Sequence, residues 1–210
     1  KICTKKNIIL IFDECTTGFR QTFGGLHKDV GVNPDIAIFG KALGNGYAIT
    51  AVIGKKEIMD YTQETFISST FWTERIGPTA ALATINFMKK NQTWKKVKKI
   101  GETIQRNWKK IASENKINMT INGIPSLTNF VFSSPDHQKY KTLITQEMLL
   151  NNILATNSVY PCIEHTEKII KKYSEKLDGT FRKIKKCEDG YDVNKYLKSK
   201  ASIKEFKRFN

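Results

Sequence analysis

The sequence feature that most constrains the fold is a continuous apolar run close to the N-terminus. The run Asn7-Ile8-Ile9-Leu10-Ile11-Phe12 leads directly into Asp13-Glu14. It is rich in β-branched residues and shows no alternation with polar ones, which predicts a strand buried on both faces. Strands of this kind are typical of parallel sheets in α/β proteins.

Two further short apolar runs follow and indicate neighbouring strands. Residues 36–39 come after the turn-forming Asn33-Pro34-Asp35 and end at Gly40-Lys41, and residues 49–53 end at Gly54. Functional groups of open α/β sheets gather where strands end, so a site is expected at these ends. About three strands are few for such a sheet, and we therefore expect an N-terminal portion of the sheet to be missing from this chain.

Beyond residue 77 the pattern becomes helical and then mixed. An alanine-rich helix is predicted from Gly77 to about Lys90, and a second helix from Thr93 carries apolar residues at spacings of three, four or seven up to Ile111. Its tryptophans, Trp94 and Trp108, are interpreted as packing residues. The later predictions are strands at 117–121 and 128–132, a helix at 140–152, an extended piece at 154–160 and a helix at 166–186.

The predicted organisation has two parts. Residues 1–91 form part of a large α/β domain, with a parallel-type sheet and helices. Residues 92–210 form a smaller α+β domain.

Composition excludes several classes of function. No apolar run is long enough to cross a membrane, and the N-terminus lacks a signal-peptide pattern. The net charge is +15, but only five of the 35 basic residues are arginine, the side chain that base readout favours. Solvated lysine-rich helix faces explain the charge better than nucleic-acid binding. We expect a cytoplasmic chain with no membrane or nucleic-acid partner.

The cysteines and histidines point to neither a disulfide framework nor a metal site. The four cysteines form no CxxC pair, and the three histidines are far apart in the sequence. The cysteines are therefore interpreted as reduced structural thiols.

Asp13 is a candidate functional residue because it ends the first predicted strand. An ionised carboxylate in a buried position needs a cationic partner, and a protonated pyridine nitrogen is one such group. A turn or a helix cap is the alternative interpretation.

Lys41 also directly follows a strand and has the small neighbours Gly40, Ala42, Gly44 and Gly46, which leave room for a planar cofactor. A confined, partly apolar site disfavours the ammonium form and frees the amine to react with an aldehyde. The alternative is a surface lysine in a loop.

The segment 68–79, SSTFWTERIGPT, places several hydroxyls before a predicted helix. A helix N-terminus accommodates a phosphate well, although simple capping by these hydroxyls explains the pattern equally well.

Taken together, three stretches resemble a known family. IFDECTTGFR, NPDIAIFGKALGNGY and SSTFWTERIGPTAALATI occur in the order found in class III aminotransferases of fold type I, and especially in the glutamate-1-semialdehyde 2,1-aminomutase-like subgroup. TQEMLLNNILATNSVYP, IEHTEKIIKKYSEKLD and the terminal EFKRFN resemble the small C-terminal domain of that subgroup.

The resemblance implies pyridoxal 5′-phosphate as cofactor and assigns roles to three residues. Lys41 would form the Schiff base, Asp13 would contact the pyridine nitrogen, and Thr70 would bind the phosphate across the interface of a homodimer. The chain departs from the common pattern by a longer FWTERIG insert between Thr70 and Pro78, which bears on Thr70.

The resemblance covers the C-terminal half of this family only. Relatives are about twice as long, and their N-terminal half supplies the phosphate cup and the aromatic residue that stacks on the cofactor. We therefore expect weak or absent activity from this chain alone, although its C-terminus looks complete.

The expected reaction is amino-group transfer between a small-molecule amino donor and a carbonyl acceptor. An intramolecular aminomutase reaction is the first alternative, and a non-catalytic remnant or basic binding module is the second. Arg75 is the first candidate for binding a substrate carboxylate, with Arg20 and Arg208 behind it. A surface or structural ion pair is the other interpretation of each arginine.

Overall fold

The computed structural model describes residues 1–203, which form two compact units. The first unit is Lys1–Lys96 and the second begins at Val97. The assignment of 1–91 and 92–210 to two domains of a larger enzyme stays a prediction. The terminal EFKRFN and Arg208 lie outside the described residues.

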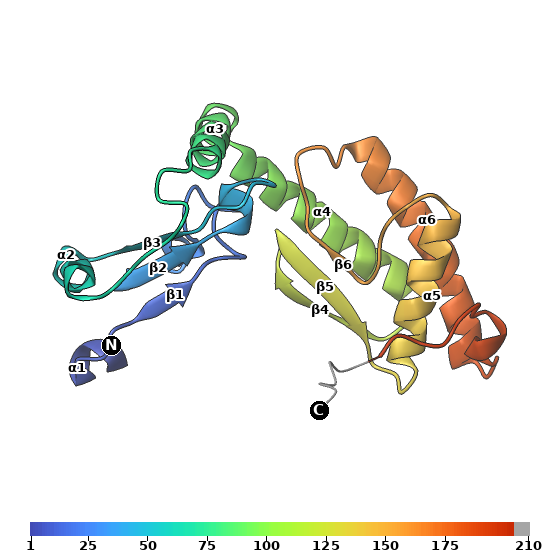
Figure 1. Cartoon of the computed structure of the whole chain (residues 1–210). Coiled ribbons are helices and arrows are strands. Elements are labelled where there is room, and N and C mark those ends of the chain that lie inside the picture. Colours follow the sequence, from blue (N-terminus) through green and yellow to red (C-terminus); the bar gives the residue numbers. More distant parts are fainter. Residues whose placement is uncertain (204–210) are drawn as a thin grey trace. The chain divides into compact units, whose positions relative to one another are not determined.

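The first unit contains a three-stranded sheet in the order β1-β2-β3, seen in Figure 1. The bounds of its elements, with η for 3₁₀ helices, are α1 Ile2–Lys6, β1 Ile11–Asp13, η1 Leu26–Lys28, β2 Ile36–Phe39, η2 Lys41–Leu43, β3 Ala51–Gly54, α2 Lys56–Met59, η3 Asp60–Glu64 and α3 Ile76–Asn91.

The sheet is mixed, and the prediction of a parallel-type sheet is therefore wrong for its third strand. β1 pairs with β2 in parallel, whereas β2 pairs with β3 antiparallel. A parallel crossover needs a dozen or more residues and usually a helix. Between β2 and β3 the chain has only η2 and turns, so it reverses direction.

The first apolar run is not buried on both faces in this chain. Ile8, Ile9 and Ile11 are each about half exposed, whereas Ala37 and Phe39 of β2 are buried. The reason is position: β1 lies at the edge of the described sheet and β2 is its central strand. The small core of this unit lies between β2, η2 and α3 and centres on Ala37, Phe39, Leu43 and Ala81.

The edge of the sheet where β1 and β2 begin is held by Asp35. Its carboxylate accepts hydrogen bonds from the backbone N–H of Leu10 (2.7 Å) and from the ammonium of Lys55 (2.7 Å). These residues stand next to β1, β2 and β3, so one carboxylate links all three strands. The hydrogen bond from Leu10 and the neighbouring Lys55 lower the pKa of Asp35.

The second unit packs helices against an antiparallel sheet in the order β4-β5-β6 (Figure 1). The bounds here are α4 Thr93–Glu114, which begins in the first unit, β4 Met119–Ile124, β5 Leu127–Phe132, α5 His137–Leu150, β6 Ser158–Val159, α6 Glu167–Glu188 and η4 Val193–Lys195.

The core of the second unit confirms the packing role predicted for the apolar face of α4. Trp108 is fully buried, its ring meets Phe130 edge to face, and its indole N–H donates to the Tyr173 hydroxyl (2.9 Å). Trp94, nearer the start of α4, instead packs on Phe23 in the first unit. Both tryptophans are thus packing residues.

Within the described chain, no helix is long and apolar enough to cross a membrane. Among the same residues, no group of histidines, cysteines and carboxylates is arranged to hold a metal ion. The four cysteines are free thiols.

Candidate functional site

The structure brings Asp13 and Lys41 to the carboxyl-terminal ends of two neighbouring strands of the first sheet. This boundary of the sheet is called the sheet edge below. Asp13 is the last residue of β1 and stands opposite Ile38 of β2. Lys41 begins η2, just beyond the end of β2. Because β1 and β2 are parallel, their carboxyl ends meet at one edge, where ligands of α/β proteins usually bind.

Asp13 is exposed in this chain, contrary to the expectation of a buried carboxylate. The cause is that β1 is an outer strand of the described sheet, which also leaves Ile11 exposed. One carboxylate oxygen, Oδ1, accepts a hydrogen bond from the Cys15 backbone N–H (3.0 Å). This contact is a local turn, the alternative that the sequence left open. The turn fixes the direction in which the chain leaves β1.

The buried carboxylate is that of the next residue, Glu14, which sequence reasoning missed. Glu14 is only 3% exposed. Its carboxylate accepts hydrogen bonds from the Thr17 hydroxyl (2.8 Å), from the backbone N–H groups of Leu26 (2.7 Å) and His27 (2.8 Å), and contacts His27 Nδ1 at 3.0 Å. Its position directly after Asp13, on the opposite face of the extended chain, was the available signal.

The hydrogen bonds to Glu14 keep it ionised despite its burial. Burial alone would raise the pKa of this carboxyl, but the bonds from Leu26, His27 and Thr17 outweigh it and hold the pKa below its ordinary value. An ionised carboxylate only accepts, so His27 Nδ1 is the donor of the pair. Glu14 thereby ties the loop after β1 to η1.

Lys41 has an unusual backbone conformation at the edge of the sheet. Its φ is 44°, in the left-handed region that non-glycine residues seldom adopt. Its side chain is exposed, and the Nζ ammonium donates a hydrogen bond to the Thr16 hydroxyl of the loop after β1. The amine is thus held by the loop that also carries Asp13 and Glu14.

Two glycines beside Lys41 are required by close approach of the chain. A Cβ atom on Gly40 would lie 2.8 Å from Cys15 Sγ, and one on Gly44 would lie 2.1 Å from the carbonyl oxygen of Tyr47. The contact at Gly44 is with backbone and is too short for any larger residue, whereas at Gly40 the Cys15 side chain would have to move. The glycines allow η2 to fold tightly against the loop after β1 and against its own exit segment.

Thr70 and Arg75 are both exposed, and the structure does not join them to the other two residues. Within the described chain, no hydrogen bond or ion pair connects either one to Asp13 or Lys41. Thr70 begins a turn and Arg75 directly precedes α3. Arg20, another arginine considered for substrate binding, donates from Nε to the Thr16 backbone carbonyl (2.9 Å).

The start of α3 is capped by Glu74 and not by the preceding hydroxyls. Its carboxylate accepts hydrogen bonds from the backbone N–H groups of Ile76 and Gly77, the latter at 3.1 Å. Within this segment, the Ser69 hydroxyl instead accepts from Phe71 N–H (3.1 Å). Capping by hydroxyls, the simple explanation of this segment, is therefore wrong.

Comparison with known proteins identifies the class to which this chain belongs. Residues 1–187 match the family model for class-III aminotransferases, and the chain is a member of that family. The members of this family use pyridoxal phosphate.

Individual relatives agree with this assignment. Over 192 residues the chain is 30% identical to a 3-aminobutyryl-CoA aminotransferase of Cloacimonas acidaminovorans, covering 89% of this chain and 46% of the relative. Over 147 residues it is 37% identical to a glutamate-1-semialdehyde 2,1-aminomutase of Nitrosopumilus maritimus, covering 68% and 35% respectively. The chain thus spans less than half the length of these curated relatives.

The fold comparison gives the same result. The FumI protein of Sphingopyxis sp. MTA144, solved in a PLP form, superposes with a TM-score of 0.81 at 17% identity, over 93% of this chain and 48% of that one. The mixed α/β fold seen here therefore corresponds to about half of a pyridoxal-phosphate-dependent aminotransferase.

The residues at the sheet edge fit part of what this cofactor requires. Lys41 offers an amine for its aldehyde, and Asp13 offers a carboxylate for its ring nitrogen, at one edge and beside small residues. The backbone N–H groups at the start of α3 are of the kind that binds a phosphate, but they already donate to the Glu74 carboxylate. The edge thus fits the reactive end of the cofactor, while its phosphate needs other groups.

Proposed function

We propose that this chain carries the covalent attachment site of a pyridoxal-phosphate-dependent amino-group transferase, with Lys41 as the attachment residue. The observation that supports this most directly is the parallel pairing of β1 and β2, which brings Lys41 and Asp13 to one edge. Family membership supplies the chemistry.

When bound, pyridoxal phosphate supplies an aldehyde that takes up amino groups and a protonated ring that withdraws electrons from the reacting carbon. Lys41 would hold the group through its amine, and its free Nζ would accept and return a proton. Asp13 would keep the proton on the ring nitrogen, because an adjacent carboxylate favours the charged form of that base.

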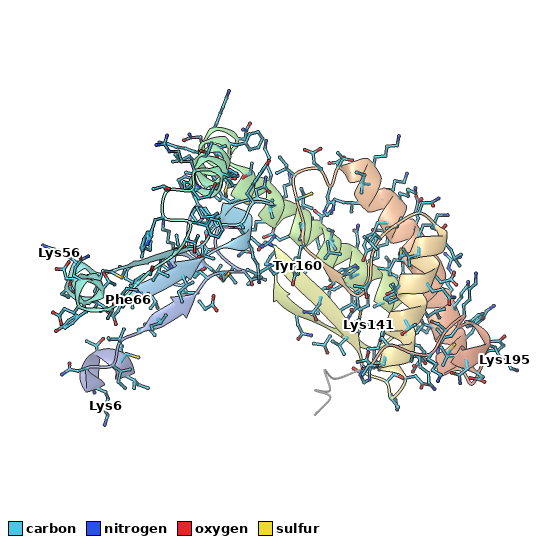
Figure 2. The ribbon with its side chains drawn as sticks, viewed as in Figure 1. Lys6, Lys56, Phe66, Lys141, Tyr160 and Lys195 are labelled. Atoms are coloured by element: carbon cyan, nitrogen blue, oxygen red, sulfur yellow. The ribbon has the colours of Figure 1, made fainter. Side chains whose placement is uncertain are left out.

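The test is covalent trapping on the 210-residue chain. The chain is incubated with pyridoxal phosphate, reduced with borohydride and mapped by mass spectrometry. We expect the label on Lys41, its loss in Lys41→Ala, and unchanged labelling in Lys56→Ala, which removes an exposed lysine on α2 (Figure 2).

Labelling spread evenly over surface lysines would contradict the proposal. DNA binding with a steep salt dependence and no label on Lys41 would instead favour a basic binding module.

A second candidate is intramolecular amine migration. The 37% identical relative that bears the name glutamate-1-semialdehyde 2,1-aminomutase favours it. The two candidates differ in whether a second carbonyl substrate is needed. Product formed from an amino aldehyde alone would favour the aminomutase, and product formed only with an added keto acid would favour the transaminase.

The proposal extends to a homodimer in which Thr70 of one subunit binds the cofactor phosphate of the other. Thr70 is exposed and makes no bond to Lys41 or Asp13 within the described residues, which leaves it available to another subunit. Sedimentation of the loaded protein tests this, since a monomer that still holds the cofactor would exclude such a contact.

A further inference from the structure

The contact between Lys41 and Thr16 points to a residue that neither motif nor family comparison assigns. The Lys41 amine donates a hydrogen bond from Nζ to the Thr16 hydroxyl oxygen, Oγ1. Thr16 lies in the loop after β1, three residues beyond Asp13. The two residues are separated by 25 positions in sequence, so the contact depends on the fold.

The loop that carries Thr16 is held by three local hydrogen bonds. Asp13 Oδ1 accepts from Cys15 N–H, and the Thr16 carbonyl accepts from Arg20 Nε. The Thr17 hydroxyl donates to the buried carboxylate of Glu14. The Thr16 hydroxyl is therefore presented by an ordered backbone and not by a free loop.

A hydrogen bond of this kind matters because a lysine side chain is flexible. Its long aliphatic stem carries about 2 kcal/mol of rotamer entropy, and holding the amine in one place before reaction removes part of that cost from the reaction itself. The hydroxyl can accept an N–H of the neutral amine and leave the nitrogen lone pair available.

We propose that Thr16 is a positioning residue that holds the Lys41 amine at the sheet edge beside Asp13, ready to react with an aldehyde. This inference rests on the proposed function, because it concerns the same amine. Thr16 acts through Lys41 and takes no part in bond making. It sets how fast the amine reacts, and it contributes little to how tightly the aldehyde first binds.

The test separates the rate of the covalent step from initial binding. The rate of covalent attachment is measured over a series of pyridoxal phosphate concentrations, which yields a first-order rate and an apparent affinity. Thr16→Val removes the hydroxyl at nearly constant volume, Thr16→Ser keeps it, and Thr120→Val, at an exposed position of β4, is the matched control.

In Thr16→Val we expect the first-order rate to fall about 3- to 10-fold, the range for loss of one hydrogen bond, with the apparent affinity nearly unchanged. Thr16→Ser should restore the rate and Thr120→Val should leave it at the native value. A rate unchanged in Thr16→Val would overturn the proposal, as would a loss that serine does not restore.

The two proposals fail in different ways. If borohydride traps no label on Lys41 of the native chain, the proposed function is wrong. If Lys41 is labelled and Thr16→Val does not change the rate of labelling, only the role of Thr16 is wrong.

Discussion

At the scale of single residues, the two consecutive carboxylates Asp13 and Glu14 differ in their exposure to solvent. Successive residues of an extended chain point to opposite faces. Asp13 therefore faces the open edge, while Glu14 is buried and satisfied by four donors. The first carboxylate is available to a ligand, and the second holds the loop that positions it.

Replacing Glu14 by glutamine should loosen that loop. Glu14→Gln removes the charge that two backbone N–H groups share, and bonds to a charged group are worth about 1.5–3 kcal/mol. We expect the amides of Leu26 and His27 to exchange hydrogen markedly faster, measured by mass spectrometry on a peptide that contains both. Glu57→Gln, at an exposed position of α2, is the control and should leave that peptide unchanged.

The same carboxylate predicts a pH dependence. The pKa of Glu14 lies below its ordinary value of 4.5 in the folded chain. Its stabilising contribution is therefore complete above pH 4.5 and is lost as the pH falls through the lower, folded pKa. The exchange difference between the native chain and Glu14→Gln should be constant near neutrality and shrink in acid. A difference that grows in acid would contradict the assignment.

At the scale of elements, α4 and α6 are joined by a buried polar contact inside an apolar core. The indole N–H of Trp108 donates to Tyr173, and both side chains are buried. Burial raises the pKa of Tyr173, so its hydroxyl remains neutral and can accept this bond across the working pH range.

Replacing Trp108 by phenylalanine should destabilise the second unit. The change leaves a cavity and an unpaired buried hydroxyl, which together cost about 2–4 kcal/mol. Urea unfolding followed by circular dichroism measures the loss of stability. Trp72→Phe is the control, because Trp72 is 66% exposed, and it should have little effect. Equal effects of the two changes would argue against a core role for Trp108.

At the scale of the whole molecule, the chain carries one part of a larger family architecture. It spans less than half of its curated relatives, and several large apolar side chains of the first unit are exposed, among them Ile11, Phe66 and Trp72. Figure 2 shows Phe66 on the segment that follows η3. Large apolar side chains are costly to leave in contact with water, so an assembled enzyme would cover them.

We predict that the 210-residue chain binds pyridoxal phosphate at Lys41 but turns over amino donors weakly or not at all. The reason is that the sheet edge supplies an amine and a carboxylate, whereas the cofactor phosphate needs further groups. Keto-acid-dependent consumption of an amine measures this directly, with Lys41→Ala as the baseline. Turnover well above that baseline would contradict the prediction.

Sequence alone predicted the order of most elements and the two ends of strands that carry Asp13 and Lys41. It could do so because strand β-branching, helical periodicity and glycine placement are local properties of the chain. The helices at 76–91 and 93–114 and the strand at 36–39 lie close to where their patterns indicated them.

Tertiary structure decided the rest. The antiparallel direction of β3, the exposure of the first apolar run and the burial of Glu14 depend on which segments pair and which lie at an edge, and local pattern does not contain that information. The bond between Thr16 and Lys41 joins positions 25 residues apart. The parallel pairing of β1 and β2 brings the two residues together. The sequence singled out Lys41, and the fold supplies Thr16 as the hydrogen-bond acceptor of its amine.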